Sequence, residues 1–192
     1  MAVVRSQEII DSWSVLIENA KGKAESIFKG TEGFITKSKA PNVSMKRKKI
    51  SPGIFRGLAG AKRDFLVVVE NGNRRLKPFQ MFIGARDYGN SLDVSWYLTF
   101  RPSSWQKLLV FWLRIPILNW LALPFALGGG MRSFLKEGKA GLDLDLFDEQ
   151  DLRAYVTTAH HCLLKAVDEL MEKLHQDPSK IERKSRGFLG IS

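Results

Sequence analysis

The sequence predicts an α+β domain in which an antiparallel, meander-type sheet of four strands is flanked by an N-terminal and a C-terminal helix. Apolar residues alternate with polar ones in the middle of the chain, and they recur every three or four positions near both ends. A long apolar run separates the third strand from the fourth and predicts a hydrophobic two-helix excursion over 103–135. The length of 192 residues suits a single domain, 1–192.

The N-terminal helix is predicted over 6–29. Ser6 is placed to cap its start, and Gly30 is placed to end it. The segment that follows, 30–62, is rich in glycine and proline and contains the basic run 46–49, so we interpret it as a basic connector. The helical spacing is carried by Ile10, Trp13, Ile17, Ala20, Ala24 and Ile27.

Three strands follow the connector, over 65–70, 79–86 and 92–101. The sequence Asn-Gly-Asn at 71–73 tolerates positive φ and predicts a tight hairpin between the first two. The third strand shows the clearest alternation, and we expect the C-terminal helix to bury one of its faces. That face carries Leu92, Val94, Trp96, Leu98 and Phe100.

The fourth strand is predicted over 142–147, where leucines alternate with Asp143 and Asp145. A C-terminal helix over 148–175 begins with acidic residues, which are favourable near the positive end of the helix dipole. A basic tail, 179–192, follows this helix. The apolar stripe of the helix consists of Leu152, Val156, Ala159, Leu163, Val167, Leu170 and Leu174.

The same helix carries three neighbouring residues whose types occur in metal and catalytic sites: His160, His161 and Cys162. Adjacent residues diverge by about 100° around a helix, so these three cannot form a nucleophile–base pair with one another. His160 flanks the apolar stripe, and we expect it to be a packing residue. We predict no catalytic residue, no metal site and no cofactor, which favours a non-enzymatic role.

The apolar run 108–127 has the length of a bilayer-spanning helix, but it contains Arg114, Asn119, Pro116 and Pro124. Its 12 Leu, Ile, Val and Phe residues favour insertion by about 4 to 7 kcal/mol, and one central arginine opposes it by about 3 kcal/mol. The asparagine and the prolines bring the balance near zero. We therefore expect two short helices that dip into one leaflet; a packed hairpin and a single span with the N-terminus inside are the alternatives. The predicted membrane-contact residues are Trp105, Leu109, Phe111, Trp112, Ile117, Trp120, Leu123 and Phe125.

The positive charge of the chain is concentrated before this run. Before Leu108 there are 19 Lys and Arg and 9 Asp and Glu, whereas after Leu127 there are 10 and 11. Such a surplus attracts anionic phospholipid or nucleic acid. The first residues lack the apolar stretch of a secretory signal, so we expect the cytoplasmic face of a membrane. The predicted anionic-surface-binding residues are Lys46, Arg47, Lys48, Lys49, Arg56, Lys62 and Arg63.

These features predict a non-enzymatic, membrane-associated protein that binds an anionic membrane surface. One alternative is nucleic-acid binding by the basic connector. Another is a carrier of lipid or a small apolar ligand, with the excursion as a hydrophobic lid and Asp143 and Asp145 as its polar centre. The excursion also offers a contact surface for a protein partner or a second copy of the chain.

Overall fold

The computed structural model describes residues 9–50, 63–100, 144–187 and 189–191. The chain divides into two compact units, Met1–Arg101 with Asp148–Ser192, and Pro102–Phe147. Nearly all of the second unit lies outside the described residues, as does the predicted two-helix excursion over 103–135. The fold described here is therefore that of the first unit, and the expectation of a single domain stays a prediction.

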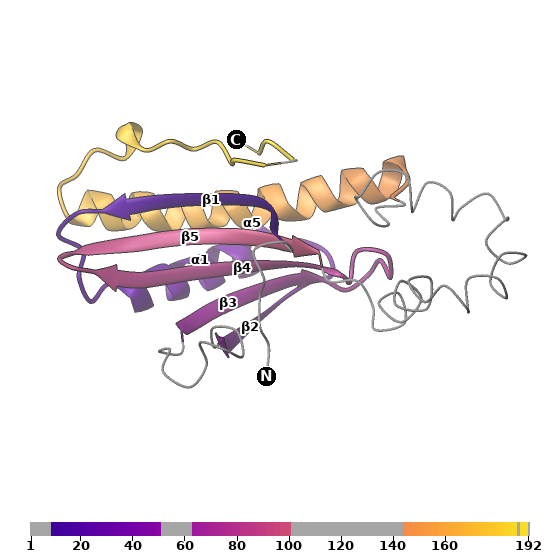
Figure 1. Ribbon diagram of the computed structural model, residues 1–192, viewed down its shortest axis with the longest axis horizontal. Helices are drawn as coiled ribbons and strands as arrows, with labels where there is room; N and C mark the ends of the chain where they lie inside the picture. The colour runs from indigo at the N-terminus through magenta and orange to yellow at the C-terminus, as the bar shows by residue number, and fades with distance from the viewer. Residues whose placement is uncertain (1–8, 51–62, 101–143, 188, 192) are drawn as a thin grey trace, which may run out of the picture. The chain divides into compact units, whose positions relative to one another are not determined.

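Five antiparallel strands form one sheet, in the spatial order β1-β5-β4-β3-β2 (Figure 1). The predicted α+β class is confirmed, but the sheet has five strands where four were expected. β3, β4 and β5 are the three strands of the predicted meander. The bounds are Ile9–Ile17 for β1, Val43–Ile50 for β2, Arg63–Glu70 for β3, Phe79–Tyr88 for β4 and Ser91–Phe100 for β5.

The prediction of an N-terminal helix over 6–29 is wrong, because Ile9–Ile17 is strand β1. Trp13 and Ile17 fit helical spacing, but they also fit the alternation of a strand. Pairing with β5, in which Trp13 lies opposite Trp96, selects the strand. Helix α1 begins later, at Ala24, and runs to Ser38.

The connector predicted over 30–62 consists mostly of regular structure where it is described. Its first residues complete α1, and Val43–Ile50 forms β2 at the edge of the sheet. Gly30 does not end the helix. A Cβ atom at this position would lie 3.0 Å from the Cβ of Ala166, so the glycine permits close packing of α1 on helix α5, Leu146–Lys173.

The prediction of a fourth strand over 142–147 is also wrong in the part that the structure describes. Residues 144 and 145 belong to neither helix nor strand, and α5 begins at Leu146. The place beside β5 is taken by β1, which comes from the other end of the chain. The predicted C-terminal helix is confirmed.

Helices α1 and α5 cover one face of the sheet, which we call the helix face; the opposite face is the outer face (Figure 1). The predicted burial of the apolar side of β5 is confirmed for Leu92, Val94, Trp96 and Leu98, whereas Phe100 at the end of the strand is half-buried. Tyr155 of α5 donates a hydrogen bond to the Val68 carbonyl (2.8 Å) and accepts one from the Met81 amide (3.1 Å). Burial raises the pKa of this Tyr155 hydroxyl. The long helix is thus fastened to β3 and β4 by a buried polar contact.

His160 is a fully buried packing residue, as predicted. Its Nδ1 accepts a hydrogen bond from Trp96 Nε1 (2.8 Å), and its Nε2 lies 2.8 Å from the Arg183 carbonyl oxygen. Because the tryptophan N–H can only donate, Nδ1 is unprotonated and Nε2 carries the proton. A neutral imidazole therefore joins β5 to the chain after α5.

The C-terminal tail, predicted over 179–192, packs against β1 where it is described. The Arg186 amide donates to the Ser12 carbonyl (2.8 Å), and Trp13 Nε1 donates to the Glu182 carbonyl (2.6 Å). One backbone bond and one side-chain bond thus join the tail to the edge of β1.

A buried carboxylate on β1 holds the end of the tail. Asp11 accepts hydrogen bonds from the Leu189 amide (3.0 Å) and the Ser185 hydroxyl (3.2 Å). Gly187 passes so close that a Cβ there would lie 2.5 Å from the Asp11 Cα. The tail is therefore part of the folded domain along this edge.

Candidate functional site

The basic run 46–49 lies on β2, which is an edge strand of the sheet. Alternation along the strand places Lys46 and Lys48 on the outer face, opposite Val67 and Phe65. Lys49 points to the helix face. All three lysines are exposed, and none forms an ion pair with another residue of the described part of the chain.

Arg47 differs from these lysines because its charge is engaged. It reaches back to α1, where its guanidinium lies 2.6 Å from Glu32 and 3.2 Å from Glu25 and sits 4.2 Å from the centre of the Phe28 ring. Burial alone lowers the pKa of Arg47, but these two carboxylates outweigh burial and leave the pKa raised. Arg47 therefore links β2 to α1, and the three lysines carry the exposed positive charge of the run.

Arg63 begins β3 on the outer face, opposite Ile50 of β2. Its guanidinium is exposed and has no ion pair or hydrogen bond within the described ranges. The other two predicted anionic-surface residues, Arg56 and Lys62, lie outside the described residues.

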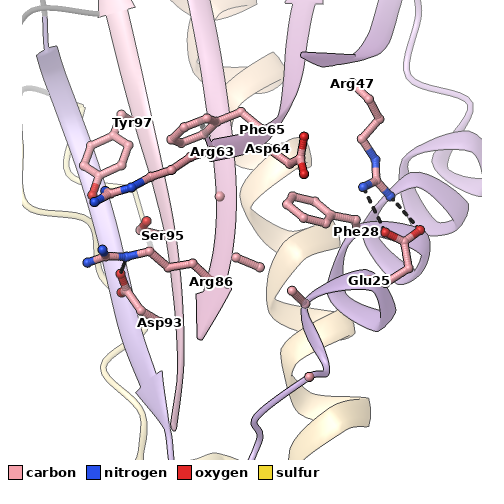
Figure 2. Close-up of a pocket in the computed structure, with 14 residues that line it drawn as sticks. Glu25, Phe28, Arg47, Arg63, Asp64, Phe65, Arg86, Asp93, Ser95 and Tyr97 are labelled. Atoms are coloured by element: carbon pink, nitrogen blue, oxygen red, sulfur yellow. Dashed lines mark hydrogen bonds and ion pairs between the residues drawn. The ribbon is translucent and has the colours of Figure 1, made fainter. Parts of the chain in front are cut away.

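A cleft opens beside Arg63, where β3 and β4 separate. The two strands pair from Phe65 with Gly84 to Val68 with Met81, and the pairing stops before Arg63. The resulting cleft has a volume of about 450 Å³. Its outer part is lined by side chains from three strands: Arg63, Phe65, Arg86, Asp93, Ser95 and Tyr97 (Figure 2).

Sequence reasoning missed Arg86, Ser95 and Tyr97 as site residues. Arg86 lies opposite Asp93 and is held by it in an ion pair of 2.9 Å. Alternation already placed Ser95 and Tyr97 on the polar side of β5. Whether these residues lie near Arg63 depends on how the strands are paired in register. The alternation within a single strand does not predict that register.

The outer face also has an apolar cluster of its own. Ile50, Val67 and Phe82 are buried there, and Phe65 and Val69 pack against them. Together with Lys46, Lys48 and Arg63, the cluster makes this face both apolar and basic. The helix face, in contrast, is covered by α1 and α5.

The predicted membrane-contact residues, from Trp105 to Phe125, lie outside the described residues, as does Asp143 of the predicted acidic pair. Neither helix in the described ranges combines the length and the hydropathy needed to cross a bilayer. In the same ranges, no three His, Cys, Asp or Glu side chains gather in a way that would hold a metal ion.

Comparison with protein families, with curated proteins and with solved structures finds no match to this chain. The candidate sites of the described residues are the basic edge strand β2 and the cleft between β3 and β4.

Proposed function

We propose that this chain is a non-enzymatic protein that attaches to an anionic membrane surface through the lysines of β2. The observation that carries this proposal is the exposure of Lys46, Lys48 and Lys49 on an edge strand, without an ion pair to any described residue. Each lysine near an anionic leaflet contributes about 1 kcal/mol of attraction. Arg63, on the neighbouring strand, adds a fourth charge.

Four charges alone give weak attachment, and stable attachment generally takes two signals. The sequence offers a second signal in the run 108–127, whose insertion balance lies near zero. A basic surface and a marginal apolar segment in one chain support reversible attachment better than permanent insertion.

Nucleic-acid binding is the second candidate, and one observation favours it. Phe65 and Tyr97 are partly exposed on the outer face, and both line the cleft beside Arg63. Aromatic rings next to basic groups bind single strands by base stacking and phosphate contacts. Phe82, another aromatic residue of this face, is buried and offers no stacking surface.

Vesicle flotation tests the first proposal. We expect the chain to float with vesicles of phosphatidylcholine and phosphatidylglycerol but not with phosphatidylcholine alone. The variant K46Q/K48Q/K49Q should lose most of this binding, because it removes the exposed charge of β2. The matched control K165Q/K180Q/K184Q removes the same charge from exposed lysines of α5 and the tail, and it should float like the wild type.

Two results would contradict the proposal. One is flotation that does not depend on phosphatidylglycerol, and the other is an equal loss in both triple variants. If a single-stranded oligonucleotide at low salt binds the wild type while the anionic vesicles do not, the second candidate replaces the first.

A further inference from the structure

Ser95 is a buried polar group that has no hydrogen-bond partner among the described residues. Its residue is 6% exposed, and its hydroxyl makes no hydrogen bond within the described part of the chain. Buried hydroxyl groups in folded proteins are nearly always hydrogen-bonded, so a group left over calls for an explanation. Ser95 lines the cleft between β3 and β4, where a bound molecule would satisfy it.

Three guanidinium groups line this cleft: Arg47 is held by Glu25 and Glu32, whereas Arg63 and Arg86 lie with Ser95 in its outer part. Arg63 has no ion pair with a described residue, and Arg86 is held by Asp93 at 2.9 Å. In Figure 2 both side chains extend to the side of the cleft where Tyr97 lies. The ion pair with one carboxylate orients Arg86 and leaves most of its N–H donors free for another acceptor.

Ser95, Arg63 and Arg86 can all donate hydrogen bonds, so the ligand they suit is an oxyanion. The cleft is also lined by three carboxylates: Asp93 is paired with Arg86, Glu25 is paired with Arg47, and Asp64 lies on the helix side. We propose that the cleft binds the phosphate group of a phosphate monoester. The donors come from three neighbouring strands, β3, β4 and β5, and together they offer enough N–H and O–H groups for the three acceptor oxygens of a phosphate, whereas a carboxylate has two. Lys48, opposite Phe65 on β2, adds positive charge near the cleft for a dianion.

The apolar part of such an ester would lie against Phe65. The ring of Phe65 covers Gly84, since a Cβ added to this glycine would lie 2.8 Å from the ring. Gly84 therefore allows the ring to lie flat on the sheet as a wall of the cleft. The volume of about 450 Å³ is within the usual range for small-molecule sites.

This site goes beyond the proposed membrane attachment and does not depend on it. The phosphate monoester could be a soluble metabolite or the headgroup of phosphatidic acid, because both present a terminal phosphate; the headgroups of most other phospholipids are diesters. The experiment has to separate these two sources.

Titration calorimetry with phenyl phosphate tests the binding site. We expect saturable binding with one molecule per chain and much weaker binding of benzoate. R63Q should weaken the binding at least tenfold, because it removes a charge-assisted contact, and S95A should weaken it about threefold to tenfold. R74Q removes one exposed charge away from the cleft and should leave the affinity unchanged.

Flotation with phosphatidic acid or phosphatidylglycerol vesicles identifies the source. Preference for phosphatidic acid that S95A abolishes indicates the lipid headgroup, whereas binding of phenyl phosphate without this preference indicates a soluble ester. Absence of calorimetric binding, equal affinity for benzoate, or unchanged affinity in R63Q would overturn the proposal. Lys48 and Arg63 belong to both proposals, but S95A removes no charge, so its effect on phenyl phosphate binding tests the cleft alone. The triple lysine variant tests the membrane proposal.

Discussion

The two edges of the sheet are built in opposite ways. At β1 the C-terminal tail continues the hydrogen bonding, with Arg186 donating to Ser12 and Trp13 donating to Glu182. At β2 no further strand is described, and exposed lysines stand along the edge. The β1 edge, which we call the sealed edge, is covered by the C-terminal tail, whereas no described segment covers the β2 edge, which we call the open edge.

The difference indicates that one edge of the sheet mainly stabilises the fold, whereas the other edge is suited to binding a partner. Unpaired edges invite association with other strands, and lysines on an edge suppress it. The lysines of β2 therefore protect the edge from aggregation, and the same charges are available to an anionic partner. Side chains at the sealed edge are buried against the tail. We therefore expect substitutions at this edge to lower the free energy of unfolding more than substitutions at the β2 edge.

The largest expected effect is on the sealed edge. Trp13 is 3% exposed and bonded to the tail, so Trp13→Ala should lower the free energy of unfolding by about 3 to 5 kcal/mol. Met45 is a partly buried residue of the open edge, and Met45→Ala should lower it by about 1 kcal/mol. Urea unfolding of both variants measures this, and equal losses would show that the two edges are equally important for stability.

The sequence predicted the parts of this fold whose local pattern agrees with their tertiary environment. β5 alternates over ten residues and packs one side under α5, so its period and its burial give the same answer. α5 carries a long apolar stripe that matches its buried residues. These elements were predicted correctly because the same pattern explains most of their residues, although Ser95 and Thr99 are buried on the polar side of β5.

The two edge strands were missed for different physical reasons. β1 contains Trp13 and Ile17, which fit both periods, and pairing with a distant strand decided between them. β2 contains four consecutive basic residues and shows no apolar alternation, so its strand structure comes from pairing with β3. The charge pattern did find the basic run, whereas Arg86 and Ser95 depend on the register of β4 and β5.

The contact between the tail and the rest of the domain should weaken in acid. Burial lowers the pKa of His160, and the hydrogen bond to the Arg183 carbonyl offsets part of this effect. Protonation would turn Nδ1 into a donor facing the Trp96 donor. The charged and titratable groups around the ring are Asp11, His161 and Arg183.

The sign of the effect follows from the lowered pKa. The unfolded chain binds a proton at His160 near pH 6.5, before the folded chain does. This contribution to stability is thus complete above about pH 6.5 and is lost as the pH falls below it. The urea midpoint should be lower at acidic pH than at neutral pH. His160→Gln should reduce this difference between the two midpoints. An unchanged difference in that variant would assign the pH dependence to other groups.

The smallest expected effect separates Arg47 from its neighbours on the open edge. Arg47→Ala removes two partly exposed ion pairs and a contact with the Phe28 ring. We expect a loss of about 1 kcal/mol, since exposed pairs contribute little each. Lys48→Ala, which removes no ion pair to a described residue, should change stability by less than about 0.5 kcal/mol.

In flotation the order should reverse, with Lys48→Gln weakening vesicle binding more than Arg47→Gln, because the arginine charge is already engaged by Glu25 and Glu32. If Arg47→Gln weakens vesicle binding as much as Lys48→Gln, net charge alone decides binding, and the placement of the lysines on the edge does not.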